Sequence, residues 1–206
     1  MTVYVVDDDE SLREALGRLL RSTGLEPTLL ASAQEFLGQQ LPEKPCCLVL
    51  DVQLPDLSGL DLQAELAAAH IQIPIIFISG VSTVPMSVRA MKAGALEFLT
   101  KPLQDAEFLR AVVEALERDR DRLQEQHDIS IWRARYESLT NRERQVMELV
   151  AQGLMNKQIA GFIGISEKTV KEHRGHVTRK MNIRSVAEFV RVGERLGMHV
   201  PSHTRT

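Results

Sequence analysis

Acidic side chains follow two apolar segments of this sequence, and their types and spacing suit the binding of a metal ion. Asp7 and Asp8 come directly after apolar residues 3–6. Asp51 comes directly after apolar residues 46–50. Carboxylates about 4 Å apart repel by roughly 4 kcal/mol at an effective dielectric of about 20, so a converging cluster needs a cation. A few solvent-accessible oxygen ligands suit Mg2+ better than zinc or a caged Ca2+.

Five short segments rich in Val, Ile, Leu and Phe alternate with segments of helix length, and these elements must bring the acids together. The five segments are residues 3–6, 28–30, 46–50, 73–78 and 95–99. Between them, Ser32 and Ser58 stand where a helix would begin, and Gly24 and Gly94 stand where one would end. This alternation predicts an α/β fold with a doubly wound, five-stranded parallel sheet.

Ligands of such sheets bind beyond the carboxyl ends of the strands, and further polar residues stand at that edge. Ser79 follows the fourth apolar segment, and Lys101 follows the fifth. We therefore expect a hydroxyl group and an ammonium group beside the three carboxylates. For Asp9 and Glu10 we expect only a capping role at the start of the next helix.

The first part of the chain resembles a known protein family in the motifs that contain these residues. The matching motifs are "DD" at residues 7–8, "LVLDVQLPDLSGL" around Asp51, "IIFISG" around Ser79 and "EFLTKP" ending at Lys101 and Pro102. Residues 1–121 are thereby similar to the CheY-like receiver domain of bacterial two-component response regulators. The resemblance implies that Asp51 accepts a phosphoryl group from a sensor histidine kinase. It also implies that Asp7, Asp8, Asp51 and the backbone carbonyl of Gln53 hold Mg2+.

The resemblance assigns further roles around the acids. Ser79 and Lys101 would donate to the phosphoryl oxygens, so that phosphorylation and dephosphorylation are self-catalysed although the protein is not a turnover enzyme. Phe98 matches the aromatic switch residue of the family, with plain core packing as the alternative. The chain departs from relatives that read "GHGD", because "GVST" follows Ser79. We expect Gln53 and Val81 to alter the lifetime of the phosphate, in a direction that the sequence does not fix.

A long helix is expected after the receiver-like part. Residues 103–138 contain neither Gly nor Pro, and apolar residues recur at helical spacing in their first half. We expect residues 122–138 to continue this helix as a linker, either as a solvated spacer or as half of a weak coiled coil. Trp132, Tyr136 and Leu139 share a face at helical spacing, so we expect them to dock the helix onto the domain that follows.

Charge divides the chain into unlike parts. Residues 1–121 hold 19 acidic and 10 basic residues, whereas residues 122–206 hold 9 acidic and 15 basic ones. The basic part suits a polyanion such as nucleic acid. No apolar run reaches the roughly 18 residues of a membrane span and no secretory signal begins the chain, so we expect a cytoplasmic protein. Cys46 and Cys47 are expected to be buried thiols.

Residues 139–206 are expected to form a domain of four short helices. Thr140 and Ser166 stand where helices would begin. The segment "LTNRERQVMELVAQGLMNKQIAGFIGISEKTVKEHRGHVTRKMNIRS" at the start of this part resembles the LuxR-type helix-turn-helix DNA-binding domain of regulators in the FixJ and NarL group. The helix at residues 167–181 would then be the recognition helix that enters the major groove.

The expected DNA contacts follow from residue type and position. Lys can reach guanine O6 or N7, Glu can accept from cytosine N4, and phosphate contacts fix the register. We expect base contacts from Lys168, Lys171 and Glu172. We expect phosphate contacts from Asn156, Lys157, Arg174, Arg179 and Lys180. His173 is expected to be a buried structural residue, and Gly175 is expected to permit a close approach to DNA.

The combined prediction is a transcription regulator that binds double-stranded promoter DNA as a homodimer once phosphorylated, with RNA polymerase as a further partner. Phosphorylation would change the surface of residues 84–116, and residues 185–196 would offer a second dimer contact. Two alternatives stand beside it. A phosphohydrolase resembling haloacid dehalogenases would use Asp51, but it needs a second acid where this chain has Gln53. A helix-turn-helix that contacts another protein would show no salt-dependent DNA binding.

Overall fold

The computed structural model describes residues 1–81 and 83–198 and divides the chain into two compact units. The first unit comprises residues 1–124, and the second begins at Glu125. Among the described residues, no helix combines the length and the apolar character that crossing a membrane requires.

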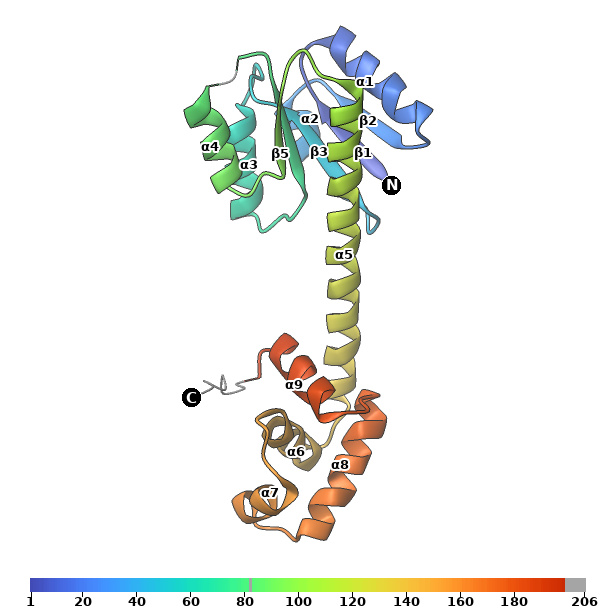
Figure 1. Cartoon of the computed structure of the whole chain (residues 1–206), viewed down its shortest axis with the longest axis vertical. Coiled ribbons are helices and arrows are strands. Elements are labelled where there is room, and N and C mark those ends of the chain that lie inside the picture. The colour runs from blue at the N-terminus through green and yellow to red at the C-terminus, as the bar shows by residue number, and fades with distance from the viewer. Residues whose placement is uncertain (82, 199–206) are drawn as a thin grey trace. The chain divides into compact units, whose positions relative to one another are not determined.

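The first unit is built on a five-stranded parallel sheet (Figure 1). Its strands are β1 (Thr2–Val6), β2 (Glu26–Leu30), β3 (Cys46–Asp51), β4 (Ile75–Ser79) and β5 (Glu97–Thr100). The strand order is β2-β1-β3-β4-β5, with β1 paired in parallel to both β2 and β3. The predicted doubly wound sheet is therefore confirmed. Because β1, β3 and β4 are neighbours and parallel, the residues that end them meet at one edge.

Helices cover both faces of the sheet. They are α1 (Glu10–Ser22), α2 (Ala33–Leu37), α3 (Gly59–Ala68), α4 (Val84–Lys92) and the first half of α5 (Asp105–Glu137). Val3 and Val5 point into the core beneath α1 and α5, whereas Tyr4 and Val6 point into the core beneath α2, α3 and α4. Two separate cores thus fix the register of β1, because a slip by one residue would exchange them.

Capping residues set the helix boundaries as the sequence predicts. The hydroxyl oxygens of Ser32 and Ser58 accept hydrogen bonds from the backbone N–H groups three residues later. Gly24 and Gly94 adopt φ values of 79° and 96°, which a residue with a side chain rarely adopts. Asp9 caps α1 through hydrogen bonds from Ser11 N and Leu12 N, which confirms its predicted capping role.

Two strands begin later in the sequence than predicted. The apolar segment 73–78 forms β4 only from Ile75 onward, and the segment 95–99 forms β5 only from Glu97 onward. Pro74 lacks an N–H group and gives the ladder only its carbonyl, which accepts from Leu48 N. Apolar character marks the buried segment, whereas backbone pairing decides where the strand starts.

The second unit is helical and carries the predicted helix-turn-helix. It contains α6 (Asn141–Ala151), α7 (Asn156–Ile163), α8 (Glu167–Met181) and α9 (Val186–Arg195), together with the end of α5. Leu139 is buried in its core, and Trp132 and Tyr136 pack against that core, as predicted. Thr140 and Glu143 form the predicted capping box of α6. Whether the middle of α5 acts as a spacer or as half of a coiled coil stays a prediction.

Candidate functional site

Three carboxylates meet at the carboxyl edge of the sheet. Asp7 and Asp8 follow β1, and Asp51 ends β3 beside it. One carboxylate oxygen from each of the three lies within 4.8 Å of the others. Asp7 and Asp51 are buried and Asp8 is exposed, so solvent reaches the cluster at Asp8.

Lys101 lies among the acids. Its Nζ donates to Asp7 Oδ2 at 2.7 Å and to Asp51 Oδ2 at 2.8 Å. Burial lowers the pKa of Lys101, but the hydrogen bonds to Asp51 and Asp7 outweigh burial and leave it above its ordinary value. Burial raises the pKa of Asp7, and the hydrogen bonds from Lys101 and from Asp9 N only partly offset this.

The charge of the cluster suits a divalent cation. Three carboxylates and one ammonium carry a formal charge of about −2 when all four are ionised. The donor atoms are oxygens, and the exposed Asp8 leaves room for water ligands. The residues present therefore fit a hard cation such as Mg2+, which would cancel the remaining charge.

Backbone contacts hold the two buried carboxylates in place. Asp9 N donates to Asp7 Oδ1 at 2.9 Å, and Gln53 N donates to Asp51 Oδ1 at 3.2 Å. Arg13 Nη1 donates to the backbone carbonyl of Asp7 at 2.6 Å. Arg13 was not predicted from the sequence, where its only signal is a position one turn into the helix that follows the acids. Its guanidinium fixes the turn that carries Asp7 and Asp8.

The predicted hydroxyl residue Ser79 ends β4, and the predicted switch residue Phe98 lies on the neighbouring strand β5. Ser79 is fully buried, and its Oγ donates to the backbone carbonyl of Val81 at 2.8 Å. Phe98 is half-buried against the core, with its ring centroid 6.1 Å from that of Phe77. Gln53 and Val81 are exposed, so both flank the acids without covering them. A metal-ligand role for the Gln53 carbonyl stays a prediction.

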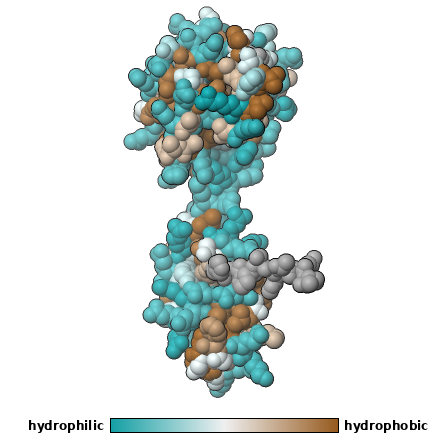
Figure 2. Space-filling view, turned by 90° about the vertical axis from the view of Figure 1, so that its left-hand side faces the viewer, coloured by the Kyte–Doolittle hydropathy of each residue, from teal (hydrophilic) through white to brown (hydrophobic). Residues whose placement is uncertain are grey.

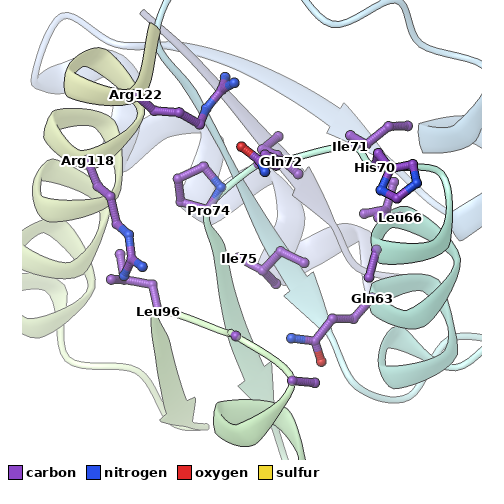
Figure 3. A pocket seen from close by; sticks show the side chains of 14 residues that line it. Gln63, Leu66, His70, Ile71, Gln72, Pro74, Ile75, Leu96, Arg118 and Arg122 are labelled. Carbon is purple, nitrogen blue, oxygen red and sulfur yellow. The ribbon is translucent and has the colours of Figure 1, made fainter. Parts of the chain in front are cut away.

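A cavity of about 550 Å³ lies elsewhere in this unit and contains none of the predicted site residues. Figure 3 shows it between α3, the start of β4 and α5, with Arg118 and Arg122 on one wall. The strands begin at this edge, whereas the acids lie where they end. This cavity and the acid cluster therefore lie at opposite edges of the sheet.

The second unit presents a basic helix beside a tight turn. Gly164 adopts a φ of 69° and ends α7, and Ser166 caps α8. The predicted base-contacting residues Lys168, Lys171 and Glu172 are all exposed on α8. This helix follows α7 through a short turn, as in a helix-turn-helix (Figure 1).

Some of the residues predicted to contact phosphate also form hydrogen bonds with other side chains of the protein. Arg174 Nη1 donates to Asn156 Oδ1 at 3.0 Å, which ties α8 to α7. Lys180 Nζ donates to Glu143 Oε2 at 2.7 Å, which ties α8 to α6. Lys157 and Arg179 are exposed. His173, expected to be buried, is only half-buried. A Cβ atom added at Gly175 would meet nothing within 4 Å.

Comparisons with known proteins find relatives for both units of the chain. Residues 3–113 match the family described as the response regulator receiver domain, and residues 137–192 match the family described as bacterial regulatory proteins of the luxR family. Nodulation protein W of Bradyrhizobium diazoefficiens is 52% identical over 202 residues, which cover 98% of this chain and 88% of that protein. Transcriptional regulatory protein FixJ of Rhizobium meliloti is 40% identical over 195 residues, which cover 93% of this chain and 94% of that protein.

Solved structures extend the likeness over both units. The structure of the response regulator StyR has a sequence 47% identical to this chain and superimposes with a TM-score of 0.79. The match covers 94% of this chain and 98% of StyR. Full-length FixJ from B. japonicum is 37% identical, with a TM-score of 0.56 and coverage of 96% and 98%. The chain therefore belongs to the two-component response regulators that join a receiver domain to a LuxR-type DNA-binding domain.

Proposed function

We propose that Asp51 accepts a phosphoryl group from a sensor histidine kinase and that this phosphorylation controls dimerisation and binding to promoter DNA. The observation that carries the proposal is the acid cluster, in which Lys101 bonds to both Asp7 and Asp51. A bond forms between a carboxylate oxygen of Asp51 and phosphorus, while the bond from phosphorus to the kinase imidazole breaks. Mg2+, held by Asp7, Asp8, Asp51 and the Gln53 carbonyl, would offset charge on the transferring oxygens.

Lys101 and Ser79 complete the site in this proposal. Lys101 already lies within hydrogen-bond distance of Asp51 and can keep its ammonium against a phosphoryl oxygen. Ser79 must give up its hydrogen bond to the Val81 carbonyl before its hydroxyl can donate to the phosphoryl group. That movement frees space beside β4 into which the half-buried Phe98 ring can turn. The site thereby links a change of charge to a change of surface.

Covalent labelling of the full chain tests the phosphorylation step. With acetyl phosphate and Mg2+, we expect intact-mass measurement to show one added phosphoryl group. Asp51→Asn and addition of a chelator should each abolish it, and the exposed Asp121→Asn should not. Equal labelling of Asp51→Asn, or no labelling of the unaltered chain, would refute the proposal.

The α4 surface supports a dimer in this proposal. Val84, Val88 and Met91 recur at helical spacing on α4 and are 76%, 43% and 44% exposed. Figure 2 shows apolar side chains among polar ones on the face of this unit that is turned to the viewer, the side on which α4 lies in Figure 1. A second copy of the chain could cover this stripe once phosphorylation alters the neighbouring β4–α4 loop. Residues 185–196 stay the proposed second contact.

We propose that α8 enters the major groove, with Lys168, Lys171 and Glu172 at base edges. Asn156, Lys157, Arg174, Arg179 and Lys180 are the proposed phosphate contacts. Arg174 and Lys180 would reach DNA while held by Asn156 and Glu143 respectively, which limits their freedom before binding. RNA polymerase is the proposed further partner at the promoter.

Selection of bound duplexes from random DNA tests the second half of the proposal. The selection is run with the unaltered chain and with Asp51→Ala, both in acetyl phosphate and Mg2+. We expect a two-half-site sequence to emerge from the unaltered chain and to be enriched less by Asp51→Ala. No enriched sequence from either protein would contradict DNA recognition.

A further inference from the structure

His176 lies on the flank of the outward stripe of α8, on the side that faces α6. Lys168, Glu172, Gly175 and Arg179 recur at three- and four-residue spacing and form the centre of that stripe. At about 100° per residue, His176 is displaced from this centre by about a quarter-turn. Its side chain is 50% exposed. When a recognition helix enters a groove, the residues near its N-terminus reach base edges, and residues at its flanks and farther along it face the two phosphate backbones.

A buried carboxylate orients the imidazole of His176. Nδ1 of His176 lies 3.5 Å from Glu143 Oε1, and the side chain of Glu143 is only 4% exposed. Glu143 Oε2 accepts from Lys180 Nζ at 2.7 Å and from Thr140 N at 2.8 Å, so the carboxylate is fixed. The Nδ1 edge of the ring therefore faces α6. Nε2, on the opposite edge, is left for an outside partner.

The protonation state of the ring decides what Nε2 can bind. Beside a carboxylate, Nδ1 keeps its proton, so a neutral ring carries a lone pair at Nε2. A lone pair repels a phosphate oxygen. Only the imidazolium form donates from both nitrogens, to Glu143 on one side and to phosphate on the other. A phosphate contact at His176 would thus need the imidazolium form of the ring.

We propose that His176 is a further DNA-phosphate contact, oriented by Glu143, and that DNA binding protonates it. The inference rests on the proposed entry of α8 into the groove. Glu143, Arg179 and Lys180 surround the ring in a hollow of about 490 Å³, and the His173 ring centroid lies 6.5 Å away. Arg179 and Lys180 oppose a further positive charge, whereas Glu143 and an arriving phosphate favour it. Gly175, the residue before His176, has no side chain, and a Cβ atom added there would meet nothing within 4 Å.

Affinity for a labelled duplex of random sequence, measured by fluorescence anisotropy with the full chain, tests this contact. Random sequence is the suitable probe because a phosphate contact does not depend on the bases. Titrations are run at several salt concentrations at about pH 6 and about pH 8, on either side of the ordinary histidine pKa near 6.5. The unaltered chain should bind more tightly at the lower pH, by at most about tenfold per pH unit for one linked proton.

Variants separate this histidine from the others. At the lower pH, His176→Gln should reduce the slope of log affinity against log salt by about 0.9, the value for one phosphate, and the slopes should coincide at the higher pH. His127→Gln, an exposed histidine on α5, should keep the full pH response. His176→Arg, with a permanent charge, should bind tightly at both pH values. Melting curves followed by Trp132 fluorescence establish that each variant is folded.

A pH response and salt slope of His176→Gln equal to those of the unaltered chain would overturn the inference while leaving DNA binding intact. Binding by His176→Arg that is no tighter than binding by His176→Gln at the higher pH would overturn it as well. A complete lack of salt-dependent binding by the unaltered chain would instead refute the proposed DNA binding, and this inference with it.

Discussion

At the scale of single residues, Lys101 compensates the charge of the acid cluster in the absence of metal. It is hydrogen-bonded to two buried carboxylates whose oxygens lie close to those of Asp8. Two unit charges 4.8 Å apart repel by about 3.5 kcal/mol at an effective dielectric of about 20. The same repulsion that makes the cluster costly without a cation gives it affinity for one.

Lys101→Ala should therefore destabilise the metal-free receiver and make its stability depend on Mg2+. Removing one partner of a buried ion pair costs about 3 kcal/mol, because the remaining charges are left uncompensated. We expect thermal unfolding in a chelator, followed by circular dichroism, to show a lowered midpoint that Mg2+ raises more than in the unaltered chain. Lys92→Ala, an exposed lysine at the end of α4, serves as the control. Identical midpoints in the chelator would contradict this account of the cluster.

Glu143 is the corresponding buried charge of the second unit. Burial raises the pKa of Glu143, but hydrogen bonds from Lys180 and Thr140 outweigh burial and lower it to about 2. A lowered carboxyl pKa contributes stability above the unfolded value near 4.3, and that contribution is lost as the pH falls toward 2.

Glu143→Gln should destabilise the second unit by about 1 to 3 kcal/mol at neutral pH. The difference from the unaltered chain should be largest above about pH 5 and should shrink as the pH falls below that. Urea unfolding followed by the fluorescence of Trp132, the single tryptophan, measures it in this unit. Glu167→Gln, an exposed acid in the first turn of α8, is the control. A difference that does not change with pH would rule out the ionised carboxylate as its source.

At this scale the sequence predicts the acid cluster of the first unit but not the hydrogen-bonded pairs that hold the helices of the second unit together. Asp7, Asp51 and Lys101 could be found because charged residues stand where apolar strands end. The bond of Glu143 to Lys180 joins residues 37 positions apart, and that of Arg174 to Asn156 joins residues 18 apart. Such pairs arise from how helices pack, and one sequence carries no signal for them.

At the scale of elements, two helical glycines differ in the space that a side chain would have. A Cβ atom added at Gly59, the first residue of α3, would lie 2.3 Å from the backbone oxygen of Asp51. The same atom at Gly175 on α8 would meet nothing within 4 Å. α3 can approach the backbone of Asp51 this closely only because Gly59 has no side chain.

Gly59→Ala should destabilise the receiver by about 1 to 3 kcal/mol, because the backbone that carries Asp51 must shift. It should also slow labelling by acetyl phosphate.

Gly175→Ala should stabilise the second unit by about 1 kcal/mol, since alanine favours a helix interior. It should nevertheless weaken DNA binding if the backbone approaches DNA there. Chemical unfolding measures the stability of both variants, and anisotropy titration measures the DNA affinity of Gly175→Ala. A stable and normally labelled Gly59→Ala would show that the contact with the Asp51 backbone does not constrain the fold.

The elements themselves were largely predictable from local signals. Ser166 marks the start of α8, and Thr140 with Glu143 marks that of α6, because a capping side chain acts within three residues. The starts of β4 and β5 were placed too early, since they depend on pairing with a distant strand. Arg13 was missed for a different reason: its partner Asp7 is near in sequence, but the hydrogen bond goes to a backbone carbonyl and so leaves no signal in residue type.

At the scale of the whole molecule, the proposed dimer links the two functions. Val88→Asp on the exposed stripe of α4 should prevent dimerisation without preventing labelling of Asp51, because it adds a charge to the surface and lies outside the acid cluster. Sedimentation velocity in beryllofluoride and Mg2+ measures this. Leu37→Asp, at the 44% exposed end of α2, should dimerise as the unaltered chain does. A dimer that survives Val88→Asp would exclude this part of α4 as its interface.

The proposed function requires that a phosphoryl group on Asp51 raise the affinity of the chain for its DNA. Its most direct test is the dissociation constant for a duplex selected from random DNA, measured with and without acetyl phosphate in Mg2+, for the unaltered chain and for Asp51→Asn. We expect acetyl phosphate to tighten binding by the unaltered chain and to leave Asp51→Asn unchanged. Equal affinities under all four conditions, or equal tightening of both proteins, would contradict the account.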